Sequence, residues 1–411
     1  MNTIEVEEQF GIPFYKRQPV SFERGAGSTV WDESGQDYLD FTSGWGVTSL
    51  GHCHPAVQSA LQQQASQLTQ NPNSGFTYSP VRARLLARLA PLLPAPLRRL
   101  YFVNSGAEAN DVAIKMARKL TGRSRVITTL GAFHGRTLNT LAVSGSSAAA
   151  ARYRPHMPDN DFVAFGDIEA LQRTINRHTA AVIVEPLQGE GGVRIPPDDY
   201  LAAVSELCQQ HGALLIVDEI QTGMGRTGSL FAFEQCRGMV RPDMMTLGKG
   251  LASGFPFAAL AMSEACAAGV ERGDHGGTYC GNPLGCAVAL AVLETMLKDD
   301  LPGNAATRGQ QLETTLLALQ ASNPGLIQQV RGRGLLWALQ VDEALVDSIA
   351  NACRQHGLLI IPTRNGVLRL LPALSVTAAE IATAMSRLAA ALSSVRVGEI
   401  ALDCFAQYPT D

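Results

Sequence analysis

Residues 214–228 read LLIVDEIQTGMGRTG, an apolar run followed by acidic residues and a glycine-rich stretch. Four successive apolar residues are typical of a strand that is buried on both faces of a sheet. Asp218 then stands at the carboxyl end of that strand, the edge at which open α/β sheets bind ligands. Because a buried carboxylate needs a cationic or hydrogen-bonding partner, we expect Asp218 to belong to a site.

The glycines at 223–228, GMGRTG, match the GxGxxG spacing of dinucleotide-binding loops. However, Asp218, Glu219 and Gln221 stand between the strand and the glycines, and no helical stripe opens at Gly228. We therefore interpret this segment as a glycine-rich loop and do not expect a dinucleotide.

Similar short apolar runs recur before and after this strand. They are RLYFV (99–103), RVITTL (125–130), AAVIV (180–184), DMMTL (243–247) and FAALAM (257–262). Helical patterns separate several of them, and residues 109–120 place their apolar side chains on one stripe. The order predicts an α/β fold with a large, doubly wound and mainly parallel sheet.

The two ends of the chain have a different pattern. VRGRGLLWALQV (330–341) and GVLRLLPAL (366–374) predict strands, as do the two halves of TVWDESGQDYLDF (29–41) around a turn. TAAEIATAMSRLAAAL (377–392) predicts a helix that opens with a capping box. We expect a large domain over 51–300, a smaller α+β domain over 301–411 and an N-terminal segment, 1–50, that joins the small domain. VRVGEIALDCFAQYPTD (395–411) receives no assignment.

Composition excludes several classes of partner. The 411 residues are 46% apolar and 17% charged, and the net charge of −4 argues against nucleic acid. No run reaches the length of a membrane span, and MNTIEVEEQF lacks a signal-peptide core. The eight cysteines show no CxxC spacing, so we expect reduced thiols in a cytoplasmic protein.

A possible metal site, GHCHP (51–55), has no second cluster of ligands. We interpret it as a turn into a helix with Pro55 in the first turn, and we expect no metal.

A second strand ending occurs in FVNSGAEAND (102–111), where Ser105 and Glu108 match a capping box. The N-terminus of the following helix offers free N–H groups and positive potential, which suit a phosphate. We expect Ser105, Gly106 and Ala107 to form that cradle, although an ordinary capped helix would explain the segment equally well.

The third strand ending holds Lys249, one of only five lysines among 33 basic residues. A desolvated lysine has a lowered pKa and is a nucleophile toward carbonyls, whereas a snorkelling lysine is the ordinary alternative. Together, a lysine, an aspartate at a neighbouring strand end and a phosphate cradle match the aldehyde, ring nitrogen and phosphate of pyridoxal 5′-phosphate (PLP).

At this point the chain resembles the class III (subgroup II) PLP-dependent aminotransferases of fold type I, from about Phe22 to about Ala390. The motifs that carry the resemblance are LGHCHPAV, NSGAEAN, AFHGRT, VEPLQGEGG, VDEIQTGMGRTG, TLGKG, GTYCGNPLGC and LRLLP. Within that class it resembles the acetylornithine, ornithine and 4-aminobutyrate aminotransferases.

The resemblance implies a set of cofactor contacts. Lys249 would bond covalently to PLP and then move a proton, while Asp218 would keep the pyridine nitrogen protonated. The remaining implied contacts are the ring stacking of Phe133, the pocket residues Glu185 and Gln221, and the phosphate ligands Ser105, Gly106 and Ala107. Thr278 would reach the phosphate of the neighbouring subunit, which implies a homodimer with shared active sites.

Three further residues would bind substrates. Arg136 resembles the arginine that binds a donor carboxylate, and Arg369 the one that clamps 2-oxoglutarate. Glu190 would pair with Arg369 and swing aside for a carboxylate. His134 is expected to be structural.

The resemblance implies ping-pong transamination with 2-oxoglutarate as acceptor and glutamate as product. The donor is an ω-amino acid or an N-acylated diamino acid, of the acetylornithine, ornithine, diaminobutyrate or 4-aminobutyrate type. Gly277, where the family often has Ser or Thr, sets the chain apart from the acetylornithine enzymes. An aminomutase or racemase is the alternative, although it needs no switch between Glu190 and Arg369. A PLP-binding regulator would need a DNA-binding module, for which the sequence offers no basic helix.

Overall fold

The computed structural model describes residues 1–145 and 148–406, and for residues 148–149 and 396–406 it describes the backbone alone. Helix α14 (Ala378–Ala406) enters the segment 395–411, but the side chains of 396–411 lie outside the described part.

The central sheet has seven strands in the order β4-β10-β9-β8-β7-β5-β6. Their bounds are β4 (Leu97–Val103), β5 (Arg125–Thr129), β6 (Asp161–Val163), β7 (Thr179–Val184), β8 (Leu214–Asp218), β9 (Met244–Leu247) and β10 (Ala258–Ser263). Strands β5 to β9 pair in parallel, and β10 is antiparallel to both β9 and β4. The predicted, mainly parallel sheet is confirmed.

Both faces of this sheet are buried, which explains the continuous apolar runs. Along β8, Leu215 and Val217 join one apolar cluster, while Ile216 joins another. The second cluster includes the apolar stripe of α5 (Gly106–Thr121), and the first includes residues of α9 (Tyr200–His211). Alternate residues of one strand therefore pack under different helices.

The other helices of this part include α3 (Pro55–Ala65), α4 (Pro80–Leu89) and α11 (Pro283–Lys298), which pack together. Shorter ones are α6 (Leu138–Leu141), α7 (Ala148–Tyr153), α8 (Ile168–Thr174) and α10 (Glu264–Ala268). Single 3-10 turns are η1 (Ser74–Phe76), η2 (Ala90–Leu92), η3 (Arg154–His156), η4 (Ala232–Gln235), η5 (Lys249–Leu251) and η6 (Glu343–Leu345). The predicted turn at GHCHP is confirmed, since His54 caps α3 and Pro55 opens it.

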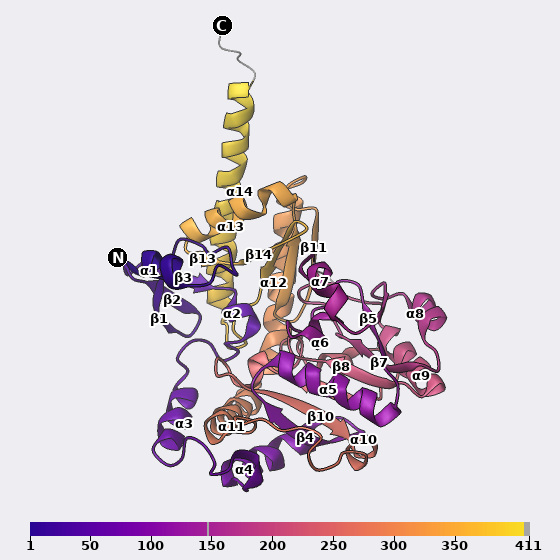
Figure 1. The fold of residues 1–411 in the computed structure, drawn as a ribbon. Coiled ribbons are helices and arrows are strands. Elements are labelled where there is room, and N and C mark those ends of the chain that lie inside the picture. The colour runs from indigo at the N-terminus through magenta and orange to yellow at the C-terminus, as the bar shows by residue number, and fades with distance from the viewer. Residues whose placement is uncertain (146–147, 407–411) are drawn as a thin grey trace.

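The small sheet is antiparallel, in the order β11-β12-β15-β14. It contains β11 (Gln329–Arg333), β12 (Leu336–Gln340), β14 (Ile361–Thr363) and β15 (Val367–Leu370), with α12 (Leu301–Ser322), α13 (Val346–Gln355) and α14 in the same half of the molecule (Figure 1). This arrangement confirms the predicted smaller α+β part.

The N-terminal segment begins with α1 (Thr3–Phe10) and continues through β1 (Phe22–Ala26), β2 (Thr29–Asp32), β3 (Asp37–Asp40) and α2 (Ser43–Gly46). Its strands form a third sheet that β13 (Leu358–Leu359) completes by pairing in parallel with β3. The first strands of the chain therefore lie beside α13 and α14 (Figure 1). The boundaries of the three predicted domains stay a prediction.

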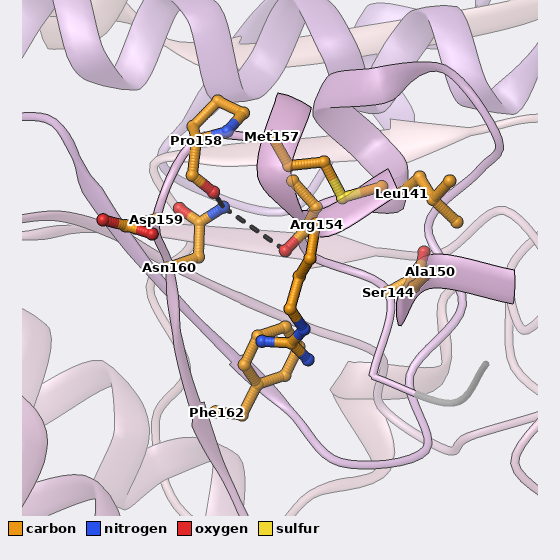
Figure 2. A pocket seen from close by; sticks show the side chains of 10 residues that line it. Leu141, Ser144, Ala150, Arg154, Met157, Pro158, Asp159, Asn160 and Phe162 are labelled. Atoms are coloured by element: carbon orange, nitrogen blue, oxygen red, sulfur yellow. Dashed lines mark hydrogen bonds between the residues drawn. The ribbon is translucent and has the colours of Figure 1, made fainter. Parts of the chain in front are cut away.

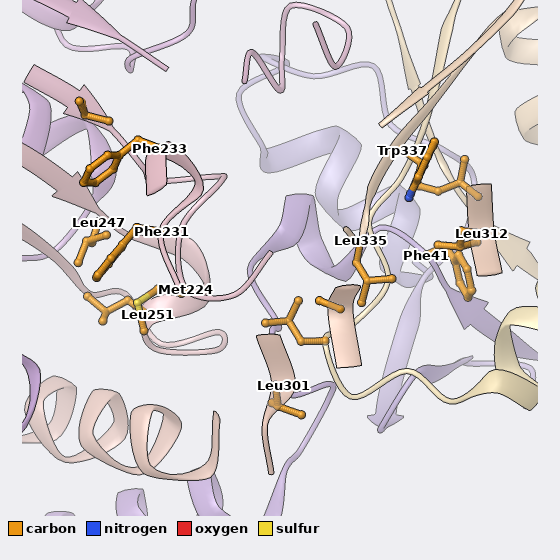
Figure 3. Close-up of a cluster of buried hydrophobic side chains, with 14 of the residues drawn as sticks. Phe41, Met224, Phe231, Phe233, Leu247, Leu251, Leu301, Leu312, Leu335 and Trp337 are labelled. Carbon is orange, nitrogen blue, oxygen red and sulfur yellow. The ribbon is translucent and has the colours of Figure 1, made fainter. Parts of the chain in front are cut away.

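One apolar cluster connects the two halves of the molecule. It extends from Phe233 and Leu247 beside the large sheet to Leu312 and Trp337 in the small part (Figure 3). None of the helices within the described ranges is long and apolar enough to cross a membrane.

Candidate active site

Six strands of the large sheet end at the same edge. Strand β10 is antiparallel to both β4 and β9, so β4 runs in the same direction as the parallel strands β5, β6, β7, β8 and β9. The residues at and after the ends of these strands, β6 excepted, enclose a cavity of about 280 Å³. Its lining is Gly106, Ala107, Phe133, His134, Gly135, Arg136, Glu185, Glu190, Asp218, Ile220, Gln221 and Lys249.

Most of the site residues expected from the sequence line this cavity, and three do not. Ser105 is the N-cap of α5 and comes directly before the lining residue Gly106. Arg369 lies behind the lining and forms an ion pair with the lining residue Glu190. Thr278 is exposed, and its carbonyl accepts hydrogen bonds from Gln70 and Ser74.

Lys249 follows β9 in a strained conformation. Its φ of 43° lies in the left-handed region, which a side chain other than glycine rarely adopts. The side chain of Lys249 is half-buried and lines the cavity, and its amine makes no hydrogen bond within the described residues. Burial lowers the pKa of Lys249, and the charge of Glu190 acts in the opposite direction without reversing the shift. The uncharged, nucleophilic amine is therefore more accessible here than it is for a lysine in water.

Asp218, at the end of β8, is held by three donors. Oδ2 accepts hydrogen bonds from Asn110 Nδ2 and from His134 Nδ1, each at 2.7 Å. Oδ1 accepts one from the backbone N–H of Ile220 at 3.0 Å. Asn110 is in turn oriented by Thr246, whose hydroxyl donates to its amide oxygen at 2.8 Å. The carboxylate is thus fixed at the base of the cavity.

Two of these partners were not expected from the sequence. Asn110 lies on the apolar face of α5. A polar residue on an apolar helical stripe needs a buried hydrogen-bond partner, and that pattern could have identified it from the sequence. The structure shows that His134, which we expected to be structural, lies in the cavity and contacts Asp218 directly.

Beside Asp218, Glu185 follows β7 and accepts a hydrogen bond from the N–H of Phe133 at 3.3 Å. Burial, reinforced by the nearby charge of Asp218, raises the pKa of Glu185 well above its ordinary value. Protonation of this side chain is therefore easier than it is for a glutamate in water.

The N-terminus of α5 presents its backbone to the cavity. Ser105 Oγ accepts from the N–H of Glu108 at 3.2 Å, but Glu108 bonds the N–H of Asn104 instead of Ser105, so the expected capping box is only half formed. The N–H groups of Gly106 and Ala107 have no acceptor within the helix.

Two glycines permit this close approach. A Cβ on Gly106 would lie 2.8 Å from Ile220 Cδ1, and one on Gly135 would lie 2.6 Å from Ala107 Cβ. Gly135 also has a φ of 139°. The bare backbone at this corner suits an anionic group such as a phosphate.

Opposite this corner, Glu190 and Arg369 form a two-point ion pair. The Nη1–Oε1 and Nη2–Oε2 distances are 2.8 and 3.0 Å, and Arg369 is fully buried. Burial acts to raise the pKa of Glu190, but the charges of Arg369 and Lys249 outweigh it and hold that pKa below its ordinary value. Gln221 donates to Glu190 Oε1 at 3.3 Å. Arg136 is exposed, with its guanidinium carbon 5.5 Å from the centre of the Phe133 ring.

The sequence interpretation also missed Trp45. Its ring centre lies 5.1 Å from the guanidinium carbon of Arg369, and its carbonyl accepts from Gln221 at 3.4 Å. Trp45 belongs to α2, where residues 43–46 have φ values of 45°, 57°, 70° and 79° in succession. This left-handed turn is held by Asp40, which accepts from the N–H groups of residues 42 and 43. The SGWG sequence alone gave no signal for it.

A second hollow of about 140 Å³ lies beside α7 (Figure 2). The guanidinium carbon of Arg154 lies 5.6 Å from the centre of the Phe162 ring, and Asn160 donates to the Pro158 carbonyl. Arg154 and Asp159 are exposed to solvent. We assign this hollow no function.

The residues of the first cavity fit PLP. A helix N-terminus opened by glycines suits the phosphate, a fixed carboxylate suits the ring nitrogen, and an amine without a hydrogen bond suits the aldehyde. Phe133 supplies an aromatic wall between them.

The chain is similar to known proteins along nearly its whole length. Residues 14–392 match the family described as aminotransferase class-III. The chain is 40% identical over 397 residues to the acetylornithine aminotransferase of Methanothermobacter thermautotrophicus, which covers 95% of this chain and 98% of that protein. It is 38% identical to the succinylornithine transaminase of Citrobacter koseri, with coverage of 96% and 98%.

Among solved structures, the ornithine aminotransferase of Toxoplasma gondii superposes with a TM-score of 0.91 at 33% identity, over 96% of this chain and 94% of that one. A match across nearly the whole length, to a family whose cofactor fits the cavity, shows that this chain belongs to the class-III aminotransferases and is a PLP-dependent enzyme.

Proposed function

We propose that this enzyme transfers the terminal amino group of an N-acylated ornithine to 2-oxoglutarate and releases an aldehyde and glutamate. The observation that carries the proposal is the two-point pair of Glu190 with the fully buried Arg369, beside Lys249. The donor's reacting amine lies far from a carboxylate, whereas the acceptor's carbonyl lies next to one. A guanidinium that can be either paired or free accommodates both substrates in one cavity.

The choice of donor rests on the relatives. Those at 40% and 38% identity carry the names acetylornithine aminotransferase and succinylornithine transaminase. These relatives favour an N-acylated donor. They do so although Gly277, where the family often has Ser or Thr, argued against acetylornithine as the donor.

The residues of the cavity divide the chemistry between them. PLP, when bound, supplies an aldehyde that links to amines and a ring that withdraws electrons from the bond being broken. Lys249 Nζ would hold the cofactor through its aldehyde and would carry a proton to and from the substrate carbon. Asp218 would keep the ring nitrogen protonated, and Phe133 would exclude water from the ring. Glu185 and Gln221 line the same pocket, and the N–H groups after Ser105 would hold the phosphate.

Substrate carboxylates meet the two arginines. Arg136, exposed at the cavity, binds the carboxylate of the donor. Arg369 binds 2-oxoglutarate once Glu190 has moved aside.

We further propose a cytoplasmic homodimer in which Thr278 contacts the cofactor phosphate of the neighbouring subunit. Thr278 is exposed and lies outside the cavity of its own chain. The cysteines whose side chains are described are free thiols, as expected in a reducing compartment.

The test is the visible absorbance of the PLP-loaded enzyme with N-acetylornithine, N-succinylornithine, ornithine, 2,4-diaminobutyrate and 4-aminobutyrate in turn. We expect an N-acylated ornithine to bleach the band and 2-oxoglutarate to restore it with release of glutamate. Bleaching by another donor alone would reject the proposed donor. Turnover of one amino acid without any acceptor would indicate the mutase or racemase instead.

A further inference from the structure

Glu190 lies at the tip of a tight loop that leaves the large sheet and packs on the small one. The loop closes between Gln188 and Arg194, whose backbone N–H and C=O groups exchange hydrogen bonds of 3.0 Å. On either side of the tip, Leu187 and Val193 are buried in an apolar cluster. The other members of that cluster, Leu336, Ala338, Ile361, Val367 and Leu371, all belong to the small part.

The same face of the small sheet carries two arginines in one row. Arg331 on β11 pairs with Ala338 on β12, and Ala338 pairs with Arg369 on β15. Side chains of directly paired residues point to the same face, and neighbouring strands lie about 5 Å apart. Ala338, which stands between the two arginines in this row, belongs to the same apolar cluster as Val193 of the loop. Both arginines therefore lie on the face of the small sheet that packs against the loop.

Each arginine contacts a different point of the loop. Arg369 binds the carboxylate of Glu190, and Arg331 donates from Nε to the carbonyl of Gly192 at 2.7 Å. A Cβ on Gly192 would lie 3.2 Å from Arg331 Nη2, so the guanidinium meets bare backbone. The loop is thus attached to the small sheet at its tip and two residues beyond it.

Arg331 is oriented by neutral oxygens. Besides Gly192, its acceptors are the side-chain oxygens of Gln329 at 2.9 Å and Gln340 at 3.1 Å. It is half-buried and makes no ion pair with any described residue. Within the described part of the chain, no ion pair therefore offsets the partial desolvation of Arg331. The feature to explain is why this guanidinium points toward Gly192.

We propose that Arg331 is a positioning residue for Glu190: it holds the loop at Gly192 so that the carboxylate of Glu190 meets Arg369 at two points. The inference rests on the proposed switch. Because the contact lies beyond the tip, Glu190 can still move aside between Gly189 and Gly191 while Arg331 keeps the loop in place. Without this contact, Arg369 is less well neutralised and captures the donor's carboxylate in an unproductive orientation. The donor half-reaction should suffer, and the acceptor half-reaction should not.

The experiment compares the two half-reactions of the PLP-loaded enzyme by rapid absorbance, with N-acetylornithine and with 2-oxoglutarate. The variants are Arg331→Gln, Arg331→Lys, Glu190→Gln and the double variant Arg331→Gln/Glu190→Gln. The matched control is Arg333→Gln, on the same strand, whose guanidinium contacts Gln235 at 3.5 Å and not the loop.

We expect Arg331→Gln to lower kcat/KM about tenfold for the donor and less than threefold for the acceptor, the size expected from one charged hydrogen bond. Arg331→Lys should recover part of the loss, and Arg333→Gln should match the unaltered enzyme. With Glu190→Gln already present, Arg331→Gln should have no further effect on the donor.

Equal losses in both half-reactions, or an undiminished effect on the Glu190→Gln background, would overturn the role of Arg331. If Glu190→Gln itself leaves the donor-to-acceptor ratio unchanged, the proposed switch fails, and this inference fails with it. Should Arg331→Gln not retain PLP, Arg331→Lys takes over the test. It is expected to shift the ratio in the same direction by a smaller factor, and no shift would reject the proposal.

Discussion

At the scale of single residues, catalysis depends on how Asp218 is held. Replacing His134 by Phe removes one of its donors from a buried carboxylate. A hydrogen bond to a charged group contributes about 1.5–3 kcal/mol, so we expect kcat to fall about 10- to 100-fold, with a smaller loss of PLP affinity. Steady-state kinetics and PLP titration measure both. His178→Phe, at an exposed position, is the control, and unchanged turnover in His134→Phe would contradict the assignment.

Lys249 gives a second prediction at this scale. Because burial lowers its pKa, the fraction of uncharged amine in the apoenzyme should rise at a pH below the ordinary 10.5. The rate at which the apoenzyme takes up PLP should increase with pH, and the midpoint of that increase should lie below pH 10.5. Glu190→Gln removes a negative charge that raises this pKa, so the midpoint should move lower still. A midpoint at or above 10.5 would show that the amine is not desolvated.

At the scale of elements, Glu219 connects strand β8 to the chain that follows it. Its carboxylate is buried and accepts from the N–H of Phe233 at 2.8 Å and from the hydroxyl of Thr222 at 2.5 Å. Burial raises the pKa of Glu219 to about 7, from an ordinary 4.5. The proton is therefore bound more tightly in the folded state than in the unfolded one.

The sign of the pH effect follows from that difference. The stabilisation from this proton is complete below pH 4.5 and is lost as the pH rises through about 7. The loss is on the order of 3 kcal/mol. Glu219→Gln keeps the shape and does not titrate, so its unfolding free energy should fall less than that of the unaltered enzyme between pH 5 and 8. Parallel denaturation curves across that range would contradict the shift.

The elements also show what a sequence can predict. β7 and β8 were predictable because burial on both faces leaves a continuous apolar run. β6 was not, since it has three residues and only one is fully buried. The left-handed turn at 43–46 depends on the distant partner His52, which lies 2.8 Å from Asp40, and local sequence does not encode such a contact.

At the scale of the whole molecule, the strand-end positions of Asp218 and Lys249 followed from the sequence pattern. The approach of Arg369 to Glu190 was implied only by family resemblance. Trp45 and Asn110 were missed because their partners, Arg369 and Asp218, are brought to them by the tertiary fold.

The proposed homodimer can be tested with hybrid molecules. Thr278→Ala should weaken PLP binding about 10- to 100-fold through the loss of a hydrogen bond to phosphate. In a hybrid of one Thr278→Ala subunit with one Lys249→Ala subunit, sharing across the interface leaves one site with both residues intact. We therefore expect half of the sites to turn over with unaltered PLP affinity. Weak PLP binding at the only active site would show that Thr278 serves its own subunit.

The parallel pairing of β3 with β13 affects the order in which the sheets of this enzyme can form during synthesis. β13 emerges about 320 residues after Asp40, a delay of roughly 15–60 s at ordinary rates of synthesis. During that interval the edge of β3 has no partner strand, while the large sheet, complete once Ser263 has emerged, can already form. Arg369, on a strand later than β13, is among the last groups to arrive. A nascent chain can therefore assemble the cofactor pocket well before it acquires the arginine that we assign to the acceptor.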